Sequence, residues 1–324
     1  MEPKDLAERI RAGDRRALAR AITLVESARA DHRAAAVALL EALGPSEGAL
    51  RIGLSGTPGV GKSSFIESFG LMLCDLGHRV AVLAVDPSSA RSGGSILGDK
   101  TRMERLSRDP RAFIRPSPSQ ALMGGVARHT REAIALCAAA GFDIVLVETV
   151  GVGQSEVMVA GMTDLFVLLL APAGGDELQG VKRGIMEMAD LVLVNKADGE
   201  LKPAAVRTCA DYAGALRLLR HRPQDPEGFP KALCVSALTC DGLEQAWEEM
   251  ETLAAWRRDS GAFAARRAEQ AQGWFAEEVR QGLIARLERD PGLKARMAEL
   301  GAAVAAGRAN PVAAAAQILA ALDR

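Results

Sequence analysis

Residues 56–64 read GTPGVGKSS, and this stretch decides the class of fold. It matches a phosphate-binding loop at each fixed position, namely Gly56, Gly61, Lys62 and Ser63. The residues before it, RIGLS, are typical of a buried strand, and KSSFIESFGLMLCDLG after it is typical of a helix. We therefore predict that backbone N–H groups of the loop bind phosphate, that Lys62 reaches the β- and γ-phosphates, and that Ser63 binds magnesium.

The chain has 324 residues, of which 48% are hydrophobic and 25% charged, as in globular proteins with a sizeable core. The net charge of -1 and the 4% of aromatic residues argue against a nucleic-acid partner. The five cysteines lack CxxC spacing and the four histidines are scattered, so we expect reduced thiols and no zinc site. With no apolar run of about 18 residues and no secretory signal pattern, we predict a cytoplasmic protein without a membrane partner.

Three regions differ in their hydrophobic pattern. Residues 1–48 are predicted to form helices, with Asp14 capping one and Gly44-Pro45 ending another. Residues 49–258 alternate short apolar runs with amphipathic ones, which predicts an α/β P-loop NTPase core whose mostly parallel central sheet is flanked by helices. The predicted strands lie in RIGLSG, RVAVLAV, FDIVLVET, DLFVLLLA, DLVLVNK and KALCVSA. Residues 259–324 return to helix.

Three acidic residues are candidates for the magnesium side of the phosphate site. Asp86 and Glu148 each follow or end a predicted strand, and Asp99 lies on a Gly/Ser-rich loop. Magnesium takes oxygen ligands and keeps several waters, so one of these acids is a candidate for contact through water. Val152 follows Gly151 where Ras-like enzymes have a glutamine, which predicts slow intrinsic hydrolysis.

The stretch LVLVNKADG, residues 191–199, indicates the base. A carboxylate at Asp198 accepts from both N1–H and the 2-amino group of guanine, a pair that adenine does not offer, and Lys196 can lie along the base plane. Ser236-Ala237-Leu238 follows the next strand, where GTPases place a backbone contact to the guanine oxygen. We predict GTP or GDP as the bound nucleotide, held by Gly56, Thr57, Gly59, Val60, Gly61, Lys62, Ser63, Ser64, Asn195, Lys196, Asp198, Ser236, Ala237 and Leu238.

By these motifs the chain resembles the methylmalonyl-CoA mutase-associated GTPases, the MeaB/ArgK family of the SIMIBI class. The resemblance covers the GTPase core and extends to both helical flanks. It is carried by GTPGVGKS, VLAVDPSSARSGGSILGDKTRM, ETVGVGQSE, GGDELQGVKRGIMEMAD and NKAD, in this order.

The resemblance implies roles for particular residues and partners. Magnesium would be held by Ser63, Asp86, Asp99 and Glu148. Gly174–Gly184 would be a third switch facing the partner, and the catalytic residues would be Lys62, Asp99, Gln179 and Lys182. The implied partners are an adenosylcobalamin-dependent methylmalonyl-CoA mutase, whose cofactor loading the protein would gate or protect, a cobalamin adenosyltransferase as a further candidate, and a second copy of the chain.

The C-terminal region has two interpretations. Phe275, Val279, Leu283 and Leu287 form an apolar stripe spaced by four residues, with charges between them. The stripe could pack on its own domain, but an exposed stripe of this length favours a homodimerisation arm.

Two basic clusters have a plain interpretation and a functional one. Arg102, Arg105, Arg108, Arg111 and Arg115 form one cluster, and residues 220–222, RHR, form the other. We interpret both as solvated helix faces, and contact with the mutase or a phosphate is the alternative.

Three alternative functions can be compared by the residues that each would require. A nickel or zinc metallochaperone GTPase of the same class would carry a CxCC or histidine-rich segment, and this sequence has neither. A kinase acting on periplasmic binding proteins, an older reading of the ArgK branch, would be expected to use ATP, which NKAD disfavours. A structural dimer module with an inactive site conflicts with the intact Lys62, Ser63 and acids.

Overall fold

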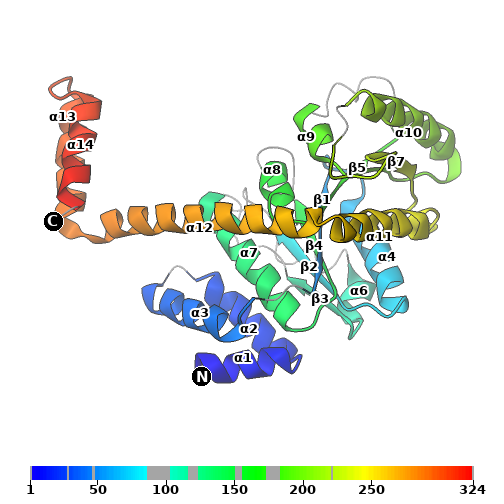
Figure 1. Ribbon diagram of the computed structural model, residues 1–324, viewed down its shortest axis with the longest axis horizontal. Helices are drawn as coiled ribbons and strands as arrows, with labels where there is room; N and C mark the ends of the chain where they lie inside the picture. Colours follow the sequence, from blue (N-terminus) through cyan, green and yellow to red (C-terminus); the bar gives the residue numbers. More distant parts are fainter. Residues whose placement is uncertain are drawn as a thin grey trace. The chain divides into compact units, whose positions relative to one another are not determined.

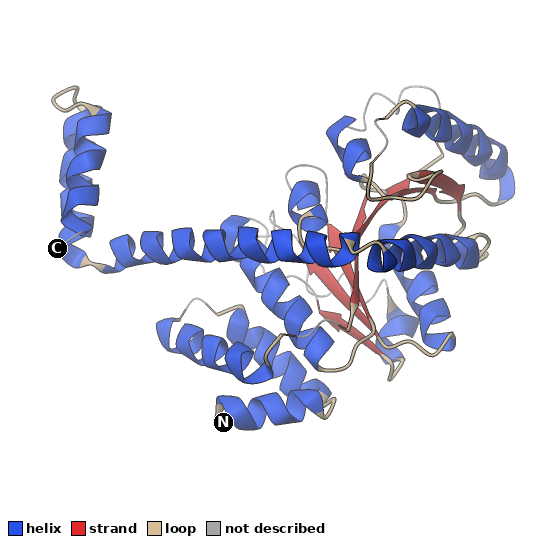
Figure 2. Ribbon diagram, viewed as in Figure 1, coloured by secondary structure: helices blue, strands red, loops and turns tan. Residues whose placement is uncertain are grey.

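Seven parallel strands form one sheet (Figures 1 and 2). This computed structural model describes residues 2–27, 29–45, 48–85, 103–115, 123–149, 155–172, 183–219 and 222–322. The strand order is β3-β2-β4-β1-β5-β6-β7, so the strand that leads into the phosphate loop lies in the middle. The strands are β1 Leu50–Ser55, β2 Val80–Val85, β3 Ala112–Arg115, β4 Ile144–Thr149, β5 Leu165–Leu170, β6 Leu191–Val194 and β7 Lys231–Cys234.

The predicted α/β P-loop fold is confirmed. Six of the seven strands correspond to the apolar runs identified in the sequence, and every strand pair is parallel. The strand missed in the sequence is β3, which has only four residues and lies inside the first basic cluster. Arg115 at its end pairs with Glu26, and Arg111 pairs with Asp109, so the interpretation of these two arginines as part of a solvated helix face is wrong.

Helices cover both faces of the sheet, and this explains why its strands are apolar on both sides. On one face α4 packs on β2 and α11 packs on α4, and Phe65, Phe69, Trp247 and Met250 of these two helices are buried in the core that includes residues of the central strands. On the other, α7 packs on β2 and β4, and α8 on β1, β4 and β5. The helices that follow the strands in the sequence are α4 Lys62–Asp75, α6 Glu104–Arg108, α7 Met123–Ala139, α8 Ser155–Ala160, α9 Arg183–Met188, α10 Lys202–Arg217 and α11 Leu243–Asp259, with a 3-10 turn at Gly199–Leu201.

The N-terminal helices α1 Pro3–Arg11, α2 Arg15–Val25 and α3 Ala30–Leu43 contact α7. Asp14 caps α2 as predicted, because its side chain accepts from the backbone N–H groups of Arg16 at 2.8 Å and Ala17 at 3.1 Å. Gly44 ends α3 with a φ of 69°, in the left-handed region that favours glycine.

The chain divides into two compact units, Met1–Ala268 and Glu269–Arg324. The first unit holds the sheet and all helices up to the beginning of α12 Ala262–Arg289, and the second holds the rest of α12, α13 Pro291–Ala305 and α14 Pro311–Leu322. Within the second unit α13 packs on α14. Phe275, Val279 and Leu283 of the predicted stripe are 71%, 46% and 50% exposed.

Among the described residues, no helix is both long and apolar enough to span a membrane.

Candidate functional site

The phosphate loop joins β1 to α4 at the carboxyl edge of the sheet. Gly59 and Gly61 have φ values of 86° and 87°, which side chains rarely adopt. A Cβ at Gly61 would also lie 2.8 Å from Nδ2 of Asn195, and one at Gly56 would lie 2.4 Å from the carbonyl oxygen of Leu169. Glycine is therefore required here both for backbone conformation and for close approach. The first turn of α4 receives no side-chain cap, so its N–H groups remain available to an anion.

Lys62 lies folded over this loop. Its ammonium donates to the carbonyl oxygens of Gly56 at 2.7 Å and Thr57 at 3.3 Å. Burial lowers the pKa of Lys62, and the charges of Glu148 and Glu156 act in the opposite direction. A partly desolvated ammonium held at the phosphate loop is suited to bind a polyphosphate, which would replace the two carbonyl contacts.

The described part of the predicted magnesium set fits such an ion. Ser63 is in the first turn of α4, and Glu148 is buried near the end of β4, the strand beside β1. A hydroxyl and a carboxylate are oxygen donors of the kind that magnesium takes. Next to Glu148, the Thr149 hydroxyl donates to the Ser55 hydroxyl at 3.0 Å, which ties the ends of the two strands together.

Asn195 links the phosphate loop to the predicted base-binding segments. Its Nδ2 donates to the carbonyl oxygen of Val60 at 2.9 Å, and its Oδ1 accepts from the N–H of Ala237 at 3.0 Å. Lys196 has a left-handed φ of 59° and donates from Nζ to the carbonyl oxygen of Gly59 at 2.7 Å. The structure thus brings the three sequence motifs together at one edge of the sheet.

Ser236 orients Asp198. Its hydroxyl donates to Oδ2 of Asp198 and accepts from the N–H groups of Leu238 at 3.2 Å and Thr239 at 3.1 Å. Oδ1 of Asp198 receives no hydrogen bond from the described residues, so this carboxylate keeps an acceptor for a ligand. Of the other predicted nucleotide-binding residues, Leu238 is 83% exposed, Ser64 is exposed and Thr57 is half-buried.

Several predicted site residues lie outside the described residues. These are Asp86, Asp99, Gln179 and Lys182, together with Gly151 and Gln154 of the segment after β4. Their placement at the site stays a prediction.

Sequence reasoning missed two structural roles at this site. The bridge made by Asn195 depends on contacts with residues more than 40 positions away along the chain. Ser68 of α4 likewise donates to the carbonyl oxygen of Ala237 at 2.6 Å, and its position inside an ordinary helix gave no signal.

Across the described residues, no group of three or more His, Cys, Asp or Glu side chains is arranged to hold a metal ion.

A parallel sheet with a phosphate loop after its central strand, and with a carboxylate-bearing NKAD loop beside it, defines a P-loop protein of the guanine-nucleotide-binding class. The chain belongs to the family described as "Methylmalonyl Co-A mutase-associated GTPase MeaB", which matches residues 18–291. It is therefore a GTPase, and the family resemblance seen in the sequence is confirmed.

Relatives and solved structures agree with this assignment. The chain is 46% identical over 277 residues to "GTPase ArgK" of Escherichia coli, covering 85% of this chain and 83% of that protein. It is 48% identical over 310 residues to the "Methylmalonic aciduria type A homolog, mitochondrial" of Mus musculus, covering 92% of this chain and 74% of that protein. A crystal structure titled "LAO/AO transport system kinase" is similar with a TM-score of 0.76 and 34% identity, covering 99% of this chain and 98% of that one.

Proposed function

We propose that this GTPase binds an adenosylcobalamin-dependent methylmalonyl-CoA mutase and gates or protects the loading of its cofactor. The observation that supports this most directly is the match of residues 18–291 to a family named for its association with that mutase. The murine relative, named for methylmalonic aciduria, supports the same assignment. A cobalamin adenosyltransferase is a further candidate partner, and the cytoplasm is the proposed compartment.

The proposed chemistry is a slow hydrolysis of GTP that the mutase accelerates. Lys62 binds the β- and γ-phosphates, and Asp198 selects the guanine base. Ser63 and Glu148, with Asp86 and Asp99, would hold magnesium, which would neutralise charge on the phosphates. The glutamine of Ras-like enzymes is absent after Gly151, so we expect an intrinsic turnover at or below about 10⁻² s⁻¹.

The proposed coupling element is the charged segment Gly174–Gly184, through Gln179 and Lys182. In the sequence it follows β5, the strand that lies next to β1 in the sheet, and β1 leads into the phosphate loop. Linkage requires that the mutase shift nucleotide affinity by the same factor by which the nucleotide shifts mutase affinity.

The test measures GTP turnover with and without the mutase for the unaltered chain and for a Gln179→Ala/Lys182→Ala variant. We expect the variant to bind GTP nearly as tightly as the unaltered chain but to lose the mutase-stimulated rate. Arg20→Ala, which removes an exposed positive charge on α2, is the control and should be stimulated normally. Stimulation of the double variant at the unaltered level would refute the role of this segment, and no nucleotide-dependent binding to the mutase would refute the proposed function.

We further propose that residues 259–324 form a homodimerisation arm. The exposed Phe275, Val279 and Leu283 support this, because a row of large apolar side chains on one helix is typically covered in the assembled protein.

A further inference from the structure

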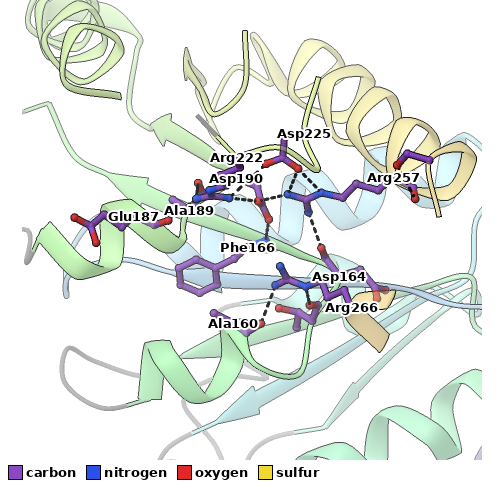
Figure 3. A network of polar contacts seen from close by, with 12 residues as sticks. Ala160, Asp164, Phe166, Glu187, Ala189, Asp190, Arg222, Asp225, Arg257 and Arg266 are labelled. Carbon is purple, nitrogen blue, oxygen red and sulfur yellow. Dashed lines mark hydrogen bonds and ion pairs between the residues drawn. The ribbon is translucent and has the colours of Figure 1, made fainter. Parts of the chain in front are cut away.

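A buried network of arginine and aspartate side chains lies at the amino ends of β5 and β6, the edge of the sheet opposite the phosphate loop (Figure 3). At its centre is Arg257 of α11, which is only 2% exposed. Its Nε donates to Asp225 at 2.7 Å and its Nη2 to Asp190 at 2.6 Å. Its Nη1 donates to the carbonyl oxygen of Asp164 at 3.0 Å. Asp190 and Asp164 directly precede β6 and β5, so Arg257 fixes where both strands begin.

Arg222 joins this network to the end of α9. Its Nη1 donates to Asp190 at 2.8 Å, and its Nη2 donates to the carbonyl oxygens of Ala189 at 2.8 Å and of Glu187. These carbonyls belong to the last turn of α9 and the residue after it. The interpretation of Arg222 as part of a solvated helix face is therefore wrong, because α10 ends at Arg217 and the Arg222 side chain is 17% exposed.

Arg266 makes the equivalent contact with α8. Its Nε donates to the carbonyl oxygen of Thr163 at 3.1 Å, and its Nη2 donates to that of Ala160, the last residue of α8, at 3.0 Å. A guanidinium at a helix C-terminus satisfies carbonyl groups that have no partner within the helix and interacts favourably with the helix dipole. Two short helices are thus held at their C-terminal ends by arginines that come from distant parts of the chain.

α8 and α9 are the helices that follow, in the sequence, the two strands β4 and β5, which end at the nucleotide edge of the sheet. β4 ends at Thr149, which contacts Ser55 of β1, and α8 begins six residues later at Ser155. The carbonyl oxygen of Leu169, near the end of β5, would lie 2.4 Å from a Cβ at Gly56, and α9 is the next helix after β5, beginning at Arg183. A helix of six residues moves as one body, so fixing its C-terminus restricts where its N-terminus lies.

The network is charged. Burial alone would raise the pKa of Asp190, but the charges of Arg257, Arg266 and Arg222 hold that pKa below its usual range. Arg266 therefore interacts electrostatically with the same carboxylate that binds Arg222 and Arg257. Buried ion networks of this kind act as a unit, because removing one partner leaves the others incompletely compensated.

We infer that Arg222 and Arg266 are positioning residues for GTP hydrolysis, each fixing the helix that follows one strand end at the phosphate site, and that Asp190 and Arg257 join the two anchors. Arg266 lies in the first turns of α12. The beginning of the C-terminal helix is thereby linked to the geometry of the hydrolytic site. This inference needs no mutase, so its failure would leave the proposed partner untouched.

The test uses the full chain and the variants Arg222→Met, Arg266→Met and their combination. Methionine keeps an aliphatic stem and removes the guanidinium. Arg267→Met is the matched control, since Arg267 is the neighbour of Arg266 and donates to Asp164 at 2.9 Å and to the carbonyl oxygen of Ala49 at 2.6 Å. These two contacts join α12 to the residues that precede β5 and β1, so Arg267→Met should report the loss of stability that follows removal of a neighbouring guanidinium. Single-turnover GTP hydrolysis and the dissociation constant of a non-hydrolysable GTP analogue are measured for each, with thermal unfolding as the stability readout.

We expect Arg222→Met and Arg266→Met each to lower the single-turnover rate about tenfold and to change analogue affinity less than threefold. The double variant should lose less than the product of the two single losses. Arg266→Lys should recover most of the rate, because lysine still donates to helix carbonyls. Rates within twofold of the unaltered chain for both single variants would overturn the inference. An equal loss of rate in Arg267→Met would overturn it too, because the effect would then follow stability rather than helix position.

Discussion

Replacing Asp198 with asparagine should exchange the base preference of this GTPase from guanine to xanthine. Oδ2 of Asp198 is oriented by the Ser236 hydroxyl, while Oδ1 receives no hydrogen bond from the described residues. A carboxylate held in this way accepts two N–H groups from one edge of guanine. The asparagine amide instead presents one acceptor and one N–H donor. That donor opposes the 2-amino group of guanine but matches the 2-oxo group of xanthine.

The magnitude follows from the charge of the lost acceptor. A hydrogen bond to a charged group contributes about 1.5–3 kcal/mol. Asp198→Asn loses one such bond and also places the asparagine N–H donor against the 2-amino donor of guanine, so it should cost at least about 3 kcal/mol of binding free energy. This corresponds to a loss of GTP affinity of roughly 100-fold, since each 1.4 kcal/mol is a factor of ten. Xanthosine triphosphate should bind Asp198→Asn more tightly than GTP does.

Titration calorimetry with both nucleotides measures the exchange. Glu200→Gln makes the same chemical change at an exposed carboxylate two residues away and should leave both affinities unaltered. Ser236→Ala removes the orienting hydroxyl, which also accepts from Leu238 and Thr239, and should weaken binding while keeping the preference for GTP. GTP affinity of Asp198→Asn within threefold of the unaltered chain would show that this carboxylate does not contact the base.

Two further predictions concern the assembly and the pH response. Phe275→Ser combined with Leu283→Ser should convert the full chain from dimer to monomer in light scattering, because both side chains are exposed on α12; a monomeric unaltered chain would contradict the proposed arm. Burial, with the charges of Arg128 and Arg33, lowers the pKa of His129 to about 4, against an ordinary value of about 6.5. Between these two values the unfolded chain binds a proton at this histidine and the folded chain does not. The free energy of unfolding should therefore fall as the pH drops from about 6.5 towards 4. Urea midpoints at pH 7 and pH 5 should differ less in His129→Gln; an unchanged difference would exclude this histidine as a cause.

The phosphate site was predictable because its signals are local. Gly56, Gly61, Lys62 and Ser63 lie within one short stretch of sequence. The left-handed φ of Gly61 and the helix that begins at Lys62 follow from the order of residue types in that stretch. The apolar runs predicted six strands for the same reason, because a strand that is buried on both faces carries apolar residues at consecutive positions instead of alternating them with polar ones. The four-residue β3 was missed because its apolar core, AFI, is too short to stand out among arginines.

The sequence by itself determined the class of fold, the phosphate loop, the guanine-recognition loop and the family. Only the tertiary structure decided which distant residues meet. Asn195 holds the three loops together through partners in separate motifs, and Arg257 neutralises Asp190 and Asp225 across 67 and 32 positions of the chain. Nothing in the spacing of residue types indicates such pairs. Their energy comes from charges that are brought together and buried only after the sheet and its helices have packed.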